Sequence, residues 1–600
     1  MLYGSEETMK KKYVLAAVMA AYMTAALWLC YEGYGNGETQ ENMETPQPTA
    51  VSDPTAPPEQ AFAPEREFLI LENDYEYSVE GYPEMYVRSE DIQVKEEDKR
   101  SILEEYALPG LERMNAQDAA EKMKDLQVML KMEAAGVDSA FLETPEFNWK
   151  AAYNKSMLAV DKAVMSFDKN VEFTGTKASE LNVFLREHGN CNIEVRSKQL
   201  LLDETIHLPS NISLDGGGVE IIAENPIEYA ILMEGVENVL LQNVRLTKGF
   251  ERGIYIVGCS NVLLRQNEVA NAGYKPVFVM GTNQSVNIVG NRIHDNAKGG
   301  IFFEGNISDC IIQHNYIYNN RGTRNLGAGL VLCSVNLDDP YVPYEQEYGK
   351  DEYLQDMMDA PHNIVIKDNV ISENYSSGIY LDGAYLCYIL DCDIKDNEKE
   401  GMCLDFGTFG VYVSGSTIER NGSRNRQSDE DLEKDFVLGL GRLEDGSSTA
   451  KLPGVSLDNA AYNIIFNNLV CGNDGSGIKM VRSGYRNLIL CNMVTDNNRG
   501  QNHAYHGFGV ELGHASRPDQ VIKGLDFTAD YENIIARNMI SGKHYSGIYI
   551  GTDCYCNDLI DNVILDCTEF SVENFSEYFN SAVGNHTNVP ALNFQLPQSP

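Results

Sequence analysis

Four short segments of this chain carry side chains suited to acid-base chemistry, and each begins with a glycine followed by alternating apolar residues. The segments are Gly378–Asp382, Gly401–Asp405, Gly454–Asp458 and Gly477–Val481. Alternate side chains of a β-strand point to opposite faces. If the leucines in these runs are buried, the aspartates that follow them face outward. The pattern therefore predicts three outward carboxylates on successive strands, with an ammonium group on the fourth.

A repeated asparagine spaces these segments and indicates how they are stacked. An Asn followed two positions later by an apolar residue recurs, often in steps of 24 residues, and it is followed, often nine residues later, by a short strand that glycine often opens. A period of this size is typical of a parallel β-helix with three short strands per turn. Asn suits a tight bend, because it tolerates the left-handed conformation and can bond to its equivalents on neighbouring turns. The copies are Asn267, Asn291, Asn315, Asn369, Asn468, Asn492, Asn538 and Asn562, with Cys392 and Ser416 as replacements.

The remaining segments predict an exported protein with the coil at its C-terminal end. Residues 1–32 hold three lysines followed by an apolar run, the pattern of a signal peptide or membrane anchor. Residues 33–64 form a Pro/Thr/Glu-rich linker. Residues 65–176 are expected to be mostly helical, with apolar residues at helical spacing in Ala119–Ala135 and Trp149–Met165. The coil is expected over 177–590, capped by a helix at Ser179–His188, with a tail at 591–600.

The composition limits which binding partners and which cellular location we expect for this protein. The net charge of −42 excludes a nucleic-acid partner, because a phosphate backbone requires clustered Lys and Arg. We expect an extracellular or cell-surface monomer that contacts the cell envelope through its N-terminal segment. The cysteines beyond Cys30 permit disulfides, but single cysteines at repeat positions are more often small buried residues.

Residues Leu181–Pro590 resemble the right-handed, single-stranded parallel β-helix proteins, a group that includes pectate lyases, polygalacturonases and alginate epimerases. The opening turns at Thr205–Leu214 are similar to those of this group. The resemblance implies an all-β fold, here of about 11–13 turns, and a polysaccharide substrate. We call the strand that is often opened by glycine the front strand. Every long insertion lies at one end of a front strand, and proteins of this group bind glycans there. A turn too tight to accept insertions is the alternative explanation.

Three stacked carboxylates favour a cation or a shared proton. Strands of successive turns lie about 4.8 Å apart, and carboxylates at that distance repel one another. Calcium binds carboxylate oxygens, so we expect a calcium site at Asp382, Asp405 and Asp458, although an acidic solvated face gives the same pattern.

Resemblance to the calcium-dependent polysaccharide lyases of this fold adds roles for particular residues. It implies metal-assisted β-elimination on a uronate-containing polysaccharide, with Lys479 as the base, Arg482 on the substrate carboxylate, and Asp405 and Asp458 also in the catalytic group. Substrate contacts are expected from Tyr380, Glu304, Glu511, His514 and Tyr549. Aromatic rings among them suit stacking on sugars.

Two other functions fit the same residues. Asp382, Asp405 and Asp458 provide the paired carboxylates of an inverting glycoside hydrolase, since a two-turn separation of about 9.6 Å lies near the upper limit for such a pair. The Gly-His-Gly motif of polygalacturonases is missing from its expected turn, and only Ile478-Lys479 is similar to their last motif. A non-catalytic glycan-binding or adhesin solenoid is the third alternative.

Overall fold

The computed structural model describes residues 167, 169–322, 324–334, 360–405, 407–423, 452–481, 484–499, 507–513, 530–552, 554–576 and 578–592. The predicted leader, the linker and nearly all of the predicted helical region therefore lie outside the described residues, as do Arg482 and His514. The chain divides into two compact units, Met1–Ala107 and Leu108–Pro600, and the second contains the coil. No helix among the described residues is long and apolar enough to cross a membrane.

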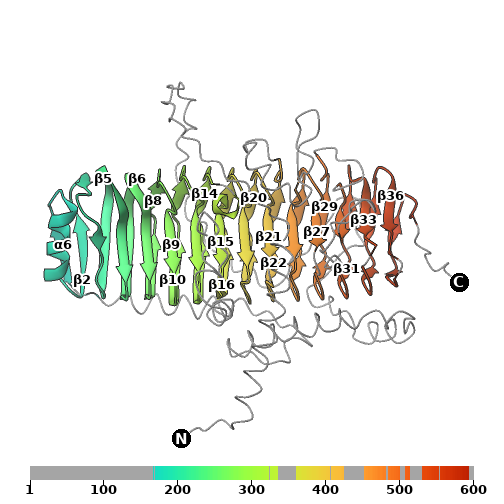
Figure 1. Cartoon of the computed structure of the whole chain (residues 1–600), viewed down its shortest axis with the longest axis horizontal. Helices are drawn as coiled ribbons and strands as arrows, with labels where there is room; N and C mark the ends of the chain where they lie inside the picture. Colours follow the sequence, from blue (N-terminus) through green and yellow to red (C-terminus); the bar gives the residue numbers. More distant parts are fainter. Residues whose placement is uncertain are drawn as a thin grey trace, which may run out of the picture. The chain divides into compact units, whose positions relative to one another are not determined.

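The described residues form a parallel β-helix of about 14 turns, which confirms the predicted fold with slightly more turns than expected. Each strand pairs in parallel with its equivalent one turn later, and the strands stack side by side in Figure 1. β5 (Ile212–Glu234) and β6 (Glu237–Val257) each pass through all three sheets of the early turns.

The three sheets follow one another along the chain in the order front, second and third. The front sheet contains β4 (Ile206–His207), β9 (Val277–Met280), β12 (Ile301–Glu304), β15 (Leu330–Cys333), β18 (Ile379–Asp382), β21 (Met402–Asp405), β24 (Val455–Asp458), β27 (Ile478–Val481), β30 (Val510–Leu512), β33 (Ser546–Ile550) and β36 (Phe570–Asn574). The second contains β1 (Lys169–Phe173), β2 (Cys191–Val195), β7 (Ser260–Arg265), β10 (Asn283–Val289), β13 (Ile307–Gln313), β16 (His362–Lys367), β19 (Tyr388–Leu390), β22 (Tyr412–Ser414), β25 (Ile464–Phe466), β28 (Leu488–Leu490), β31 (Ile534–Ala536), β34 (Asp558–Ile560) and β37 (Ser581–Val583). The third contains β3 (Gln199–Leu201), β8 (Glu268–Ala270), β11 (Arg292–His294), β14 (Tyr316–Tyr318), β17 (Val370–Ser372), β20 (Asp393–Lys395), β23 (Thr417–Glu419), β26 (Leu469–Cys471), β29 (Met493–Thr495), β32 (Met539–Ser541), β35 (Val563–Leu565) and β38 (His586–Thr587).

One continuous apolar core fills the coil, built from the inward residues of all three sheets. At the N-terminal end α6 (Ala178–Glu187) buries Leu181 and Leu185, confirming the predicted capping helix. The cysteines that the structure describes form no disulfide and are mostly buried, as single cysteines in a repeat predict. A short 3-10 helix, η3 (Arg324–Gly327), precedes β15.

Asparagine ladders run along the coil at its turns. In the predicted ladder, the Asn291 side-chain amide donates to Asn315 Oδ1 at 3.0 Å, and the Asn291 backbone N–H donates to the same oxygen at 2.9 Å. Two further ladders were not predicted, one between the third and front sheets and one between the front and second sheets. They contain Asn296, Asn320, Asn374, Asn397, Asn421, Asn473 and Asn497, and Asn463, Asn487, Asn533, Asn557 and Asn580.

The expectation that the ladder asparagines themselves adopt the left-handed conformation is wrong. Positive φ values belong to the residue before the ladder position, such as Gln266 (54°), His314 (55°) and Asp368 (53°). The side-chain amide of a ladder residue must point along the coil axis. The preceding residue, which has the positive φ, therefore turns the backbone from one sheet to the next. This explains why Cys392 and Ser416 replace Asn in the ladder without breaking the repeat.

A glycine opens most front strands and makes room for the next turn. A Cβ on Gly401 would lie 2.5 Å from Ile418 Cγ2, 2.7 Å from Gly454 O and 2.8 Å from Asn421 Nδ2. Gly378 and Gly477 meet the equivalent three kinds of atom. Turn spacing and ladder position together require glycine there, which accounts for the Asn-to-Gly interval in the sequence.

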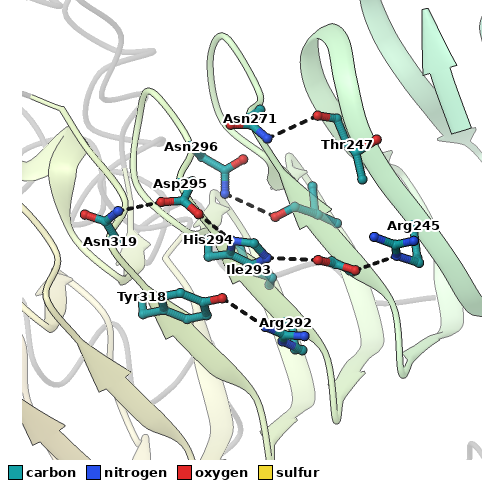
Figure 2. A network of polar contacts seen from close by, with 12 residues as sticks. Arg245, Thr247, Asn271, Arg292, Ile293, His294, Asp295, Asn296, Tyr318 and Asn319 are labelled. Carbon is teal, nitrogen blue, oxygen red and sulfur yellow. Dashed lines mark hydrogen bonds and ion pairs between the residues drawn. The ribbon is translucent and has the colours of Figure 1, made fainter. Parts of the chain in front are cut away.

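The outer face of the third sheet carries a polar cluster centred on His294 (Figure 2). The His294 ring lies 2.7 Å from Asp295 Oδ2 and 3.2 Å from Glu268 Oε1, and it stacks on the Tyr318 ring at 4.6 Å. Burial alone would lower the pKa of His294, but the hydrogen bonds to Asp295 and Glu268 outweigh it and raise the pKa. The hydrogen bond from His294 is also the main reason that the pKa of Glu268 falls to about 2.

We predict that Gly401→Ala destabilises the coil by about 1–3 kcal/mol, because the added methyl group overpacks a site without free space. Denaturant unfolding measures the change. The matched control is Gly189→Ala, where a Cβ would meet no atom within 4 Å. Equal stabilities of the two variants would contradict the packing explanation.

The stability supplied by His294 should depend on pH. Because its folded pKa is raised, this contribution is complete below the unfolded pKa of about 6.5 and is lost as pH rises through the folded pKa. We expect His294→Gln to cost stability at about pH 5 and much less at about pH 9, measured by denaturant unfolding. His314→Gln should show the opposite trend, because burial lowers the pKa of His314. A cost for His294→Gln that is the same at both pH values would refute the assignment.

Candidate functional site

The outward residues of the front sheet stack in the two columns expected from the sequence. Asp382 pairs in register with Asp405, and Leu404 pairs with Leu457, which places Asp458 next in the column. The other column passes through Tyr380, Cys403, Ser456, Lys479 and Glu511. Residues far apart in the sequence thus become neighbours on one sheet.

The three aspartates form a nearly buried row whose first two members share a tyrosine. Asp382, Asp405 and Asp458 are 8%, 7% and 8% exposed. The Tyr380 hydroxyl lies 3.3 Å from Asp382 Oδ2 and 3.1 Å from Asp405 Oδ2. Burial raises the pKa of Tyr380 well above its usual range, and the charges of Asp405 and Asp382 raise it further. The phenol is therefore a hydrogen-bond donor at neutral pH, with one proton available to two carboxylates.

Lys479 is held in an ion pair on the outer face of the same sheet. Its ammonium lies 2.9 Å from Glu511 Oε1, and the Glu511 side chain is fully buried. Ser476 Oγ donates to the other carboxylate oxygen of Glu511 at 2.7 Å. In this pair Lys479 contacts Glu511, and its predicted role as a base stays a prediction.

A second buried ion pair lies two turns before Asp382 in the same column. Lys275 Nζ is 2.7 Å from Glu304 Oε1, and the two side chains are 0% and 2% exposed. The Lys275 ammonium also lies over the Phe278 ring at 4.3 Å. The predicted substrate residue Glu304 therefore neutralises a buried cation in this arrangement. The sequence did not single out Lys275, because nothing in the repeat marks a turn lysine that folds back over the sheet.

Tyr549 occupies its predicted place on β33, where it is 8% exposed. Its ring stacks on Phe508 at 4.5 Å. A ring already paired in this way has one face covered, which restricts its use in stacking on a sugar.

The described side chains do not by themselves fit calcium. Calcium takes about 6–8 oxygen ligands, whereas each of these turns supplies one aspartate, and the Tyr380 hydroxyl lies between the first two. Among the described residues no group of three or more His, Cys, Asp or Glu side chains is arranged to hold a metal ion. Calcium therefore stays a prediction that needs ligands from elsewhere in the chain, and no chemical step is assigned to it.

Two family descriptions match parts of the chain. "Right handed beta helix region" matches residues 229–418, and "Periplasmic copper-binding protein (NosD)" matches residues 344–507. A search of the curated proteins finds no match.

Several solved structures are similar in fold. The A-module of the mannuronan C-5 epimerase AlgE6 from Azotobacter vinelandii is 12% identical, with a TM-score of 0.46, and the match covers 70% of this chain and all of that one. The catalytic unit of a GH87 alpha-1,3-glucanase from Streptomyces thermodiastaticus is 10% identical, with a TM-score of 0.38 and coverage of 70% and 68%. Gene product 12 of bacteriophage phi29 is 13% identical, with a TM-score of 0.45 and coverage of 66% and 53%. The matching family description and the parallel stacking of the strands give the chain a right-handed parallel β-helix fold. The likeness to these solved structures carries no argument about activity.

Proposed function

We propose that this chain is a carbohydrate-active enzyme that uses Asp382, Asp405 and Asp458 as acid-base groups on a polysaccharide. The single observation that carries the proposal is the row of nearly buried carboxylates in which Tyr380 bridges the first two. Like charges held this close favour retention of one proton between them. The pair can then supply one protonated and one ionised carboxyl group.

Hydrolysis of a glycosidic bond makes the most direct use of these groups. Glycosidases require one carboxylic acid to protonate the leaving oxygen and one carboxylate as base or nucleophile. Adjacent turns place two carboxylates about 4.8 Å apart, close to the separation of about 5–5.5 Å in retaining enzymes. Asp382 and Asp458 are two turns apart, near the upper limit for inverting enzymes.

Elimination at a uronate is the second candidate. It is favoured by the position of Lys479, which pairs in register with Ser456 and therefore lies one turn from Asp458 on the same face of the front sheet. For Lys479 to act as base, its pair with Glu511 must open and the ammonium must lose a proton. Arg482, the expected partner of the substrate carboxylate, lies outside the described residues. Calcium belongs to this route, and a chelator tests it.

The extracellular or cell-surface location is part of the proposal and rests on the sequence of the first 32 residues. A polysaccharide too large to enter a cell requires an exported enzyme. The acidic composition is compatible with a neutral glycan, whereas a uronate polymer needs local cations to offset the net charge of −42.

We predict that Asp405→Asn lowers glycan degradation by at least about 100-fold, because it removes a group that carries a proton in the reaction. Tyr380→Phe should also lower the rate, by a smaller factor. Asp393→Asn on the third sheet is the matched control and should leave the rate unchanged. Neutral and uronate-containing polysaccharides are incubated with each protein, with and without chelator. The masses of the products are then measured by mass spectrometry.

The products separate the alternatives. Hydrolysis adds one water molecule for each glycosidic bond that is broken. Elimination instead gives an unsaturated uronate, which absorbs ultraviolet light. If elimination depends on calcium, a chelator stops the reaction. A folded Asp405→Asn variant with full activity refutes the assigned site. If no polysaccharide is degraded by the wild type, the non-catalytic glycan-binding solenoid replaces the enzyme.

A further inference from the structure

The outer face of the second sheet carries a long apolar row whose first residues are fully buried. The row runs in register from β13 to β31 and is called the outer row below. Antiparallel or parallel, a sheet face exposed to water is normally polar. The outer row consists of Ile311, Val365, Tyr388, Tyr412, Ile464, Leu488 and Ile534.

Part of the outer row is fully screened from solvent although it lies outside the coil. Ile311 and Val365 are both 0% exposed and form, with Leu390, a cluster separate from the core. Their strand neighbours Ile312 and Ile366 belong to the core, so alternation places Ile311 and Val365 on the other face. Neighbours within a single layer leave the tips of such side chains open to water. A second layer must therefore cover this face.

The third sheet differs from the second in burial. From β14 to β23 most of its outward residues are polar, and β26, β29 and β32 carry Leu469, Met493 and Met539. These apolar side chains are only half-buried, whereas Ile311 and Val365 are fully buried. The described elements other than strands are α6, which packs at the first turns, and η3. No described helix therefore accounts for the cover of the outer row.

We propose that residues 119–165 of this chain dock along the outer row. In the sequence this segment ends shortly before β1, which opens the second sheet, and it belongs to the same compact unit as the coil. If helical, its 47 residues reach about 70 Å. The rise from β1 to β31 is about 58 Å at the spacing of stacked strands. The segment is therefore long enough to follow the whole row.

The sequence of the segment matches the surface it would cover. Tyr153, Met157, Val160 and Val164 follow the i, i+4, i+7, i+11 pattern that places apolar side chains on one face of a helix. The segment 335–359, which joins β15 to β16, is instead rich in Asp and Glu and contains Pro340 and Pro343, which interrupt a helix.

Hydrogen exchange of the full-length protein, followed by mass spectrometry, tests the proposal. Amides within 149–165 should exchange at least about tenfold more slowly than in an unfolded chain. Val365→Glu should abolish this protection, because it places a charge in the docking surface, while peptides from the coil stay protected. Val370→Glu is the matched control, since it lies in the same turn on the third sheet. Met157→Glu makes the same test from the segment's side and leaves the coil sequence intact.

Each other outcome overturns the proposal. Unprotected amides throughout 119–165 in the wild type, or protection that survives Met157→Glu, mean that another segment covers the row. A wild-type dimer that Val365→Glu converts to a monomer, measured by light scattering, assigns the row to a second copy of the chain.

Discussion

Hydrogen bonds between asparagine amides of successive turns hold the register on which the rest of this structure depends. Each ladder amide accepts from the backbone and side chain of the turn before and donates to the turn after, as at Asn291 and Asn315. These groups are buried, and a buried amide without partners is costly. A slip of one residue in any turn would leave several such groups unpaired, so the ladders fix the stacking more firmly than the apolar core alone.

That register is what turns a repeated sequence into a site. Asp405 and Asp458 are separated by a long insertion, yet the ladder pair Asn421–Asn473 spans it and keeps the two strands adjacent. Insertions are confined to the ends of front strands, where they do not interrupt the ladders. The front sheet can therefore collect carboxylates, a tyrosine and paired cations from distant parts of the chain at a fixed spacing of about 4.8 Å.

The sequence predicted the parts of this arrangement that depend on period. The Asn repeat located the coil, one ladder and the outward columns, and alternation gave the facing of Asp382, Asp405 and Asp458. The ladder through Asn320 was missed although it follows the first by five residues, because the Asn–apolar pattern was sought at one turn only. The sequence could not predict which side chains contact one another. The Lys275–Glu304 pair depends on how a turn folds over the sheet, and the bridging hydroxyl of Tyr380 depends on a rotamer.

The central claim is that this row of carboxylates meets a glycan, and a crystal structure of Asp405→Asn grown with an oligosaccharide tests it most directly. The account predicts sugar density over the front sheet between β18 and β24, with a glycosidic oxygen within hydrogen-bonding distance of Asp382 or Asp458. Sugar bound on another face of the coil, or a front sheet that stays empty at saturating oligosaccharide, would contradict it.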